Sequence, residues 1–265
     1  MQTDAEPART QEQLAAPVQQ NIALPTWRLH MRLILVRHGD PDYQKDCLTE
    51  LGHRQAENVV KRLLGEGIEE IYSSPMGRAR QTAEPFARES GIGTVHILDF
   101  MREIRFGPID ALYTSGNPWT GSLELIGKGA DLQSPEWRNY PEFVNNTATT
   151  DIDDIAVHTD EWLATFGFQR EGLYYRCTNA GDRKKTIVLF SHGGSSTALL
   201  SRVLNIPFPH LCCILGHLQH TSVSVLRFDG RPGILAMPVI EIASDSTHLK
   251  SFMGELAERP HFDNK

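Results

Sequence analysis

The sequence predicts an α/β protein with a doubly wound, mostly parallel sheet flanked by helices and an inserted cap region. Two runs, 32–36 and 186–190, are short and strongly apolar, as in central strands that are buried on both faces. Segments with helical periodicity alternate with these and other short apolar runs. Strands that alternate with helices in this way favour a layered α/β architecture.

The composition is that of an ordinary globular chain. Its 265 residues suggest one or two domains, and 40% are apolar, which is enough for a sizeable core. The formal net charge of −7 gives no basis for nucleic-acid binding. No apolar run has the ~18 residues of a membrane span, and no secretory signal opens the chain. We therefore expect a cytoplasmic protein without nucleic-acid or membrane partners.

The cysteines indicate neither a disulfide framework nor a zinc site. They include an adjacent pair and no CxxC spacing: Cys47, Cys177, Cys212 and Cys213. We therefore expect no structural metal and no oxidising compartment.

The first thirty residues differ from the rest of the chain. Residues 1–30 are rich in Gln, Ala, Pro and Thr, a composition that cannot bury enough apolar surface to offset the entropy of ordering. They predict a flexible tail, with the folded domain over 31–265. A true start at Met31 would give the same pattern.

The first half of the folded domain contains three strand candidates and two helix candidates. The run 32–36 is followed by a helical pattern from Thr49 to Leu64, which two glycines end. Residues 70–72 and 94–98 predict short strands. Between them, Ser73-Ser74-Pro75 predicts a helix start, with serine as the N-cap and Pro75 as the first helical residue.

The second half begins with an insertion. Residues 107–178 are rich in Gly, Pro, Trp and Asn, and predict a cap with one helix over 152–166 and no further sheet layer. The strand at 186–190 comes next, then a helix over 196–204. Two runs at 223–228 and 234–240 predict the last two strands.

Both strongly apolar strands end in a His-Gly step. These are His38-Gly39 and His192-Gly193. Ligands of open α/β sheets bind at the carboxyl ends of strands, so both histidines have a route into one crevice. Glycine after each lets the backbone turn sharply and approach a ligand closely.

Two arginines belong to the same region. Arg37 precedes the first histidine, and Arg78 lies in the first turns of the helix after 70–72. Arg80 and Glu84, at i,i+4 spacing, make an ordinary surface pair, which leaves Arg78 for the crevice. Two arginines and two histidines form a suitable cage for a dianionic phosphoryl group.

Five short motifs follow one another along the chain between Leu35 and Gly194. They are Leu35-Val36-Arg37-His38-Gly39, Leu48-Thr49-x-x-Gly52-x-x-Gln55-Ala56, Tyr72-Ser73-Ser74-Pro75-x-x-Arg78-Ala79-x-Gln81-Thr82-Ala83, Met101-Arg102-Glu103-x-x-x-Gly107 and Phe190-Ser191-His192-Gly193-Gly194. Together they resemble the histidine phosphatase superfamily, in its phosphoglycerate-mutase-like branch, over most of 31–228.

The resemblance implies a phosphoric monoester hydrolase that needs no metal or other cofactor. His38 would be the nucleophile that forms phosphohistidine, with Arg37, Arg78 and His192 on the phosphoryl oxygens. Glu103 would protonate the leaving oxygen and then activate water. The implied partner is a small phosphorylated metabolite; the sequence specifies no oligomeric state.

Some residues near the motifs are less regular. The family often has an amide, usually Asn, six positions after the nucleophile, and here Gln44 occupies that position. The acidic residues Asp40 and Asp42 are unexpected beside a phosphate and face either a cationic part of the substrate or water. His220, which directly precedes a strand, is a further pocket residue. With His217 it has metal-ligand spacing, but the rest of a ligand set is missing.

Two other functions remain open at this stage. A phosphoglycerate mutase uses the same residues, although the chain after Glu103 lacks the continuation that we expect of a mutase. A phosphate-binding module without turnover would normally have lost the nucleophile or the acid, and both candidates are present. The sequence therefore favours a phosphatase.

Overall fold

The computed structural model describes residues 28–107, 116–178, 181–182 and 184–252. Its central sheet has six strands in the order β11-β9-β1-β8-β4-β5. In that order they are Val239–Asp245, Val223–Gly230, Leu29–Arg37, Lys184–Ser191, Glu70–Ser73 and Val95–Ile97. Strand β9 is antiparallel to both of its neighbours, whereas β1, β8, β4 and β5 are mutually parallel. The expected mostly parallel sheet is confirmed.

Strands β1 and β8 lie at the centre of the sheet because both of their faces are apolar. They pair in parallel from His30 with Lys184 to Arg37 with Ser191. Residues 33–36 of β1 and 186–191 of β8 are all buried. The pairing brings the carboxyl ends of the two strands, where the His-Gly steps follow, to the same edge.

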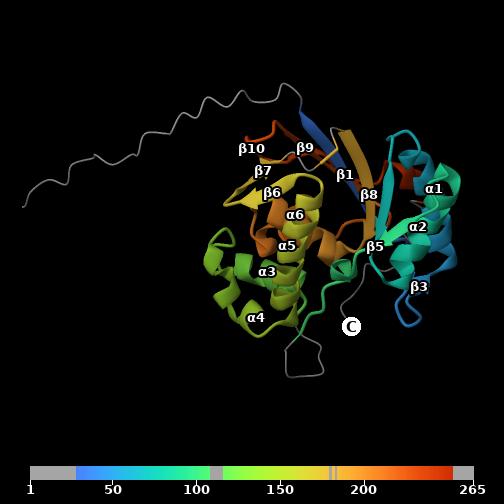
Figure 1. Cartoon of the computed structure of the whole chain (residues 1–265). Helices are drawn as coiled ribbons and strands as arrows, with labels where there is room; N and C mark the ends of the chain where they lie inside the picture. Colours follow the sequence, from blue (N-terminus) through green and yellow to red (C-terminus); the bar gives the residue numbers. More distant parts are fainter. Residues whose placement is uncertain (1–27, 108–115, 179–180, 183, 253–265) are drawn as a thin grey trace, which may run out of the picture.

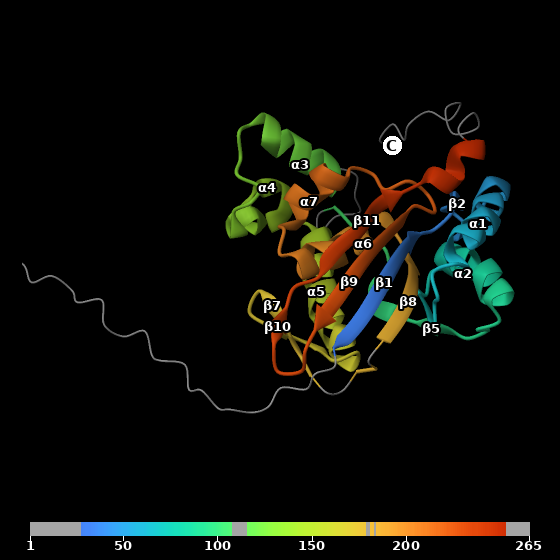
Figure 2. The same cartoon turned by 90° about the horizontal axis from the view of Figure 1, so that it is seen from above.

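Helices cover both faces of the sheet (Figure 1 and Figure 2). Helices α1 (Glu50–Leu63) and α2 (Gly77–Ser90) pack on one face, where Val59 and Phe86 join a cluster with Ile34 and Val188. Helices α5 (Thr147–Thr165), α6 (Gly193–Leu204) and α7 (Phe208–Leu215) lie on the other face in the larger cluster. The core therefore has two layers that the sheet separates.

The starts of two helices were predicted from the sequence, and one of these predictions is confirmed. Helix α1 begins where the sequence predicts, because the Thr49 hydroxyl accepts the N–H of Gly52. The prediction for α2 was wrong: its N-cap is Met76, two residues beyond Ser74, and Pro75 lies outside the helix. The Ser74 hydroxyl accepts the N–H of Met76 and forms a hydrogen bond with Nε2 of His192. Ser74 therefore makes a tertiary contact and does not cap the helix.

The cap region contains more structure than expected. It includes α3 (Pro118–Gly127), η2 (Pro135–Asn139), α4 (Pro141–Val144) and α5, the last beginning earlier than predicted at the Asn146 cap. The prediction of no further sheet layer was wrong. Strands β6 (Phe168–Glu171) and β7 (Tyr174–Cys177) form a second sheet with β10 (Leu235–Ala236).

The single strand expected over 234–240 is also wrong, because it divides into two strands in different sheets. Strand β10 pairs with β7, and β11 pairs with β9. Pro238 lies between them, and proline has no N–H to donate to a sheet ladder.

The fold also contains several shorter strands and 3₁₀ helices. A hairpin of β2 (Pro41–Asp42) and β3 (Cys47–Leu48) follows the first His-Gly step. Short 3₁₀ helices η1 (Asp99–Met101) and η3 (Thr247–Phe252) follow β5 and β11. Strand β1 begins at Leu29, so the last residues of the expected tail 1–30 are ordered in the sheet; residues 1–27 lie outside the described residues.

Within the described ranges, no single helix is long and apolar enough to cross a membrane, and only α6 and α7 together, bent by 117° at their break, pass that test of length and composition.

Candidate active site

The parallel pairing of β1 and β8 places His38 beside His192. The backbone N–H of His38 donates to the carbonyl of Ser191 at 2.8 Å, and the two imidazole centroids are 5.1 Å apart. The residues are 1% and 0% exposed. Two residues far apart in the sequence thus share one buried point, as the strand-end argument predicted.

The neutral tautomer of His38 follows from its hydrogen bond. Its Nδ1 lies 2.7 Å from the carbonyl of Gly39, which can only accept, so Nδ1 carries the proton. Burial holds the pKa of His38 well below 6.5, and electrostatic interactions with His192 and Arg37 lower this pKa further. The Nε2 atom therefore has a lone pair at neutral pH, as a nucleophile requires.

Arg78 is directed at that nitrogen. Its Nε lies 3.4 Å from Nε2 of His38, and the residue is 4% exposed. Its Nη1 donates to Oδ1 of Asp46 at 2.6 Å, and the other Asp46 oxygen accepts the N–H of Gly77 at 2.7 Å. A β-carbon on Gly77 would lie 2.2 Å from the Asp46 carbonyl, so glycine permits this close approach.

Arg37 contributes a second guanidinium. Its Nη1 donates to the carbonyl of Leu218. Its Nε is buried and has no hydrogen-bond partner among the described residues. Burial lowers the pKa of Arg37 below its usual value, although an arginine remains charged at physiological pH. A buried N–H donor without a partner is costly, and an anion in the cage would satisfy it.

His192 forms the N-cap of α6 and is fixed by the loop before α2. Its Nε2 lies 2.7 Å from the Ser74 hydroxyl, whereas its Nδ1 is buried without a partner in the described part of the chain. Burial, with Arg78 and Arg37 adding to it, lowers the pKa of His192 well below 6.5. The first turn of α6 adds backbone N–H groups that favour an anion.

Glu103 lies where the chain after η1 meets the start of α6. Its Oε1 accepts the backbone N–H groups of Ser195 and Ile104, both at 3.0 Å. Burial raises the pKa of Glu103, although Arg37 opposes that shift. Because Oε1 accepts two hydrogen bonds, a proton on this carboxyl group belongs on Oε2.

The two sequence-predicted glycines have different reasons to be small. A β-carbon on Gly39 would lie 2.6 Å from the carbonyl of Gly52, whereas one on Gly193 would meet Arg37 Nε at an ordinary 3.7 Å. The backbone N–H of Gly39 donates to the Thr82 hydroxyl at 3.0 Å. Gly39 therefore serves close packing against α1, and Gly193 opens α6 beside Arg37.

His220 and Gln44 lie in contrasting positions. The His220 ring is 5.5 Å from that of His38, and its Nδ1 is 3.8 Å from the buried Asp40 carboxylate. Gln44 is exposed at the tip of the β2–β3 hairpin, where its N–H donates to Asp42.

Two residues of the hairpin were missed by the sequence reasoning. The Tyr43 ring packs edge-on against His38 at 6.4 Å and lies 5.3 Å from the Arg78 guanidinium. Asp46 holds Arg78 as described above. The short polar hairpin has no periodicity that could have indicated which of its side chains turn inward.

His217 and His220, which are three residues apart in the sequence, do not form a metal site together. His217 stacks on Trp119 at 5.2 Å, while His220 faces His38. Among the described residues, no group of three or more His, Cys, Asp or Glu side chains could hold a metal ion. All four cysteines are free thiols.

The cage thus combines a neutral imidazole with a lone pair on Nε2, two guanidiniums, a second imidazole and a carboxyl group. This set can bind a dianionic phosphoryl group and stabilise the charge that develops when a phosphate ester is cleaved.

Comparisons with known proteins find a matching family model and similar curated proteins. Residues 33–117 match the family model of the histidine phosphatase superfamily, branch 1. Relatives named probable phosphoglycerate mutase GpmB, from Yersinia enterocolitica and Yersinia pestis, are 28% and 29% identical over 83% of this chain and 95% of their own length. The chain is therefore similar to members of the histidine phosphatase superfamily.

Solved structures are similar to this chain at the level of the fold. A mycobacterial glucosyl-3-phosphoglycerate phosphatase is 21% identical with a TM-score of 0.55, covering 82% of this chain and 99% of that one. A phosphoserine phosphatase mutant from Entamoeba histolytica, in complex with phosphoserine, is 23% identical with a TM-score of 0.53, covering 83% and 99%. These two folds match the six-stranded sheet and its flanking helices.

Proposed function

We propose that this protein is a histidine phosphatase, a metal-independent phosphomonoesterase that acts through a phosphohistidine on His38. The observation that carries the proposal is the buried His38 Nε2, deprotonated and 3.4 Å from Arg78. The substrate class is a small phosphorylated metabolite in the cytoplasm.

The reaction has two steps. His38 Nε2 attacks phosphorus, a nitrogen–phosphorus bond forms, and the ester oxygen leaves with a proton from Glu103 Oε2. Water then attacks phosphorus, Glu103 takes a proton from that water, and the nitrogen–phosphorus bond breaks to release inorganic phosphate. Each step restores the protonation state that the next one needs.

The remaining cage residues stabilise charge. Arg37 and Arg78 provide guanidinium N–H donors for the phosphoryl oxygens. His192, hydrogen-bonded to Ser74, lies with its ring 5.1 Å from that of His38. His220, beside His38, and the N-terminal turn around Gly193 extend the same surface. The exposed side chain of Gln44 is the least supported of the proposed binding residues.

The test is hydrolysis of p-nitrophenyl phosphate and a panel of phosphorylated metabolites in EDTA. We expect turnover by the natural sequence, loss of at least about a thousandfold in His38→Ala, and an acid-labile ³²P label on the natural sequence alone. His53→Ala, at an exposed histidine of α1, is the matched control and should retain activity. Equal activity in His38→Ala and the natural sequence would refute the mechanism.

A second candidate is phosphoglycerate mutase activity, which the names of the Yersinia relatives favour. A mutase retains the phosphoryl group and returns it to the other hydroxyl of the glycerate. Incubation with 3-phosphoglycerate distinguishes the two, since a phosphatase releases inorganic phosphate and a mutase forms 2-phosphoglycerate. Binding of phosphate without either product would instead indicate a recognition module.

A further inference from the structure

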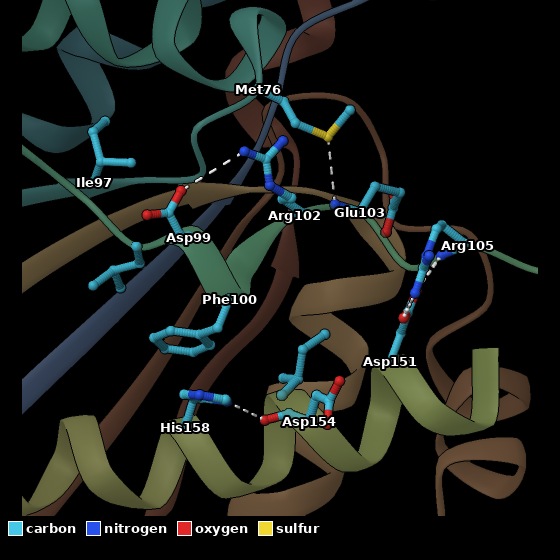
Figure 3. Close-up of a pocket in the computed structure, with 12 residues that line it drawn as sticks. Met76, Ile97, Asp99, Phe100, Arg102, Glu103, Arg105, Asp151, Asp154 and His158 are labelled. Carbon is cyan, nitrogen blue, oxygen red and sulfur yellow. Dashed lines mark hydrogen bonds and ion pairs between the residues drawn. The ribbon is translucent and has the colours of Figure 1, made fainter. Parts of the chain in front are cut away.

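A second hollow lies beside the cage and shares Glu103 with it. It has a volume of about 780 Å³ and lies between the segment from Ile97 to Arg105 and helix α5 (Figure 3). Met76 also lines it, and its sulfur accepts the N–H of Glu103 at 3.5 Å. We call this space the Glu103 cavity.

The proposed reaction assigns a role to Glu103, the residue that the cage and the Glu103 cavity share. In an in-line displacement the nucleophile and the leaving oxygen lie on opposite sides of phosphorus. His38 attacks from one side, so the group that protonates the leaving oxygen must reach it on the other. If Glu103 is that group, the organic part of the ester leaves the cage past Glu103, toward the cavity that this residue borders.

The floor of the Glu103 cavity is apolar and partly aromatic. The Phe100 ring stacks on His158 of α5, with centroids 5.6 Å apart and planes 18° from parallel (Figure 3). Ile97 is 44% exposed, and Ile155 of α5 lines the same space. An exposed apolar surface of this kind gains free energy when an apolar ligand covers it.

The charges around the cavity disfavour a further anion. Four carboxyl side chains line it, those of Asp99, Glu103, Asp151 and Asp154, against the guanidiniums of Arg102 and Arg105. Arg105 is already held by Asp151, with Nη2 to Oδ1 at 2.7 Å and Nε to Oδ2 at 3.1 Å. Arg102 lies 3.7 Å from Asp99. Both guanidiniums therefore already have a carboxylate nearby.

We propose that the Glu103 cavity is the leaving-group subsite, and that it selects phosphomonoesters of bulky, uncharged, apolar alcohols over small esters that carry a carboxylate. The inference rests on the proposed phosphatase function and adds its substrate class. A three-carbon acid such as the glycerate of 3-phosphoglycerate would leave most of the cavity unfilled and would add a negative charge beside the carboxylates of Asp99, Asp151 and Asp154.

The experiment compares kcat/KM for three esters of alkyl alcohols: 3-phenylpropyl phosphate, propyl phosphate and 3-phosphoglycerate. The first two leaving groups have similar basicity, so their ratio reports binding of the phenyl ring. We expect 3-phenylpropyl phosphate to exceed propyl phosphate by at least about tenfold. Phe100→Ala should reduce this ratio severalfold, and Phe100→Leu should restore part of it.

A second variant tests the charge argument. Asp154 is exposed on α5, so Asp154→Asn should fold, and it should raise kcat/KM for 3-phosphoglycerate relative to propyl phosphate severalfold. Val157→Ala, on an exposed position of the same helix outside the cavity lining, is the control and should leave both ratios unchanged.

The outcomes separate the two proposals. A phenylpropyl-to-propyl ratio near one, or a ratio that Phe100→Ala does not alter, would overturn the subsite while phosphatase activity stands. Preference for 3-phosphoglycerate in the natural sequence would also overturn it. If none of the three esters is hydrolysed and no phosphohistidine forms, the proposed function fails and the subsite fails with it.

Discussion

Asp46 holds Arg78 in the orientation that points its Nε at Nε2 of His38. One carboxylate oxygen accepts from Arg78 Nη1 at 2.6 Å, and the other accepts the first N–H of α2, that of Gly77. The β2–β3 hairpin is thereby tied to the helix that carries Arg78. The guanidinium cannot rotate away from His38 without breaking a charged hydrogen bond.

We expect Asp46→Asn to lower kcat by about ten- to a hundredfold, because a misplaced guanidinium no longer matches the transition state. The affinity for inorganic phosphate should not weaken, since the substitution also removes a negative charge near the cage. Steady-state kinetics and phosphate inhibition measure the two effects. Asp42→Asn, whose residue bonds the backbone of the same hairpin, is the control. Equal losses of kcat and phosphate affinity would contradict a positioning role.

The raised pKa of Glu103 predicts how activity depends on pH. The acid must be protonated to expel an alkoxide, so kcat/KM for alkyl phosphates should fall as the pH rises above that pKa. Glu103→Gln should remove this basic limb and lower kcat/KM by about 10²- to 10⁴-fold. For p-nitrophenyl phosphate, whose leaving group needs no proton, the loss in the first step should be much smaller. Similar losses for both ester types would argue against general acid catalysis.

Gly194 has no room for a side chain beside Glu103. A β-carbon there would lie 2.4 Å from Ile104 Cγ1 and 2.6 Å from Glu103 Oε1. Gly194→Ala should therefore displace Glu103, reduce kcat/KM and cost about 1–3 kcal/mol of unfolding free energy. Gly193→Ala, whose β-carbon meets Arg37 Nε at 3.7 Å, should cost less by both measures. Urea unfolding and kinetics of the two variants test this order.

The buried histidines predict a loss of stability in acid. The pKa values of His38 and His192 lie well below 6.5 in the folded protein, so below pH 6.5 the unfolded chain binds protons that the native state does not. The free energy of unfolding should then fall with pH, by up to about 1.4 kcal/mol per pH unit for each histidine.

Urea unfolding at pH 7.5, 6.5 and 5.5 measures this slope. The double variant His38→Asn/His192→Asn should show a shallower slope than the natural sequence below pH 6.5. Glu103 acts in the opposite direction, since its raised pKa lets the native state hold a proton above 4.5, and it remains the same in both proteins. Identical slopes would show that the two histidines are not held neutral in the fold.

Local signals in the sequence were sufficient to predict those strands and helix starts that depend only on residues near one another in the chain. The apolar runs of β1 and β8 and the start of α1 after Thr49 lie where the sequence predicts them. The expected start of α2 failed because the Ser74 hydroxyl bonds His192, a contact that no local pattern contains. The expected strand over 234–240 failed because its two parts pair with different sheets.

The sequence by itself determined the chemical groups of the candidate site, since a His-Gly step after each apolar strand and the arginines near them are visible in the chain. Only the tertiary structure decided how they act. It set the protonation of His38 by burial, fixed Arg78 through Asp46, and placed the cavity between η1 and α5 beside Glu103. Periodicity reports the face that one element buries, whereas pKa values, positioning contacts and cavities arise from segments that the chain brings together only when it folds.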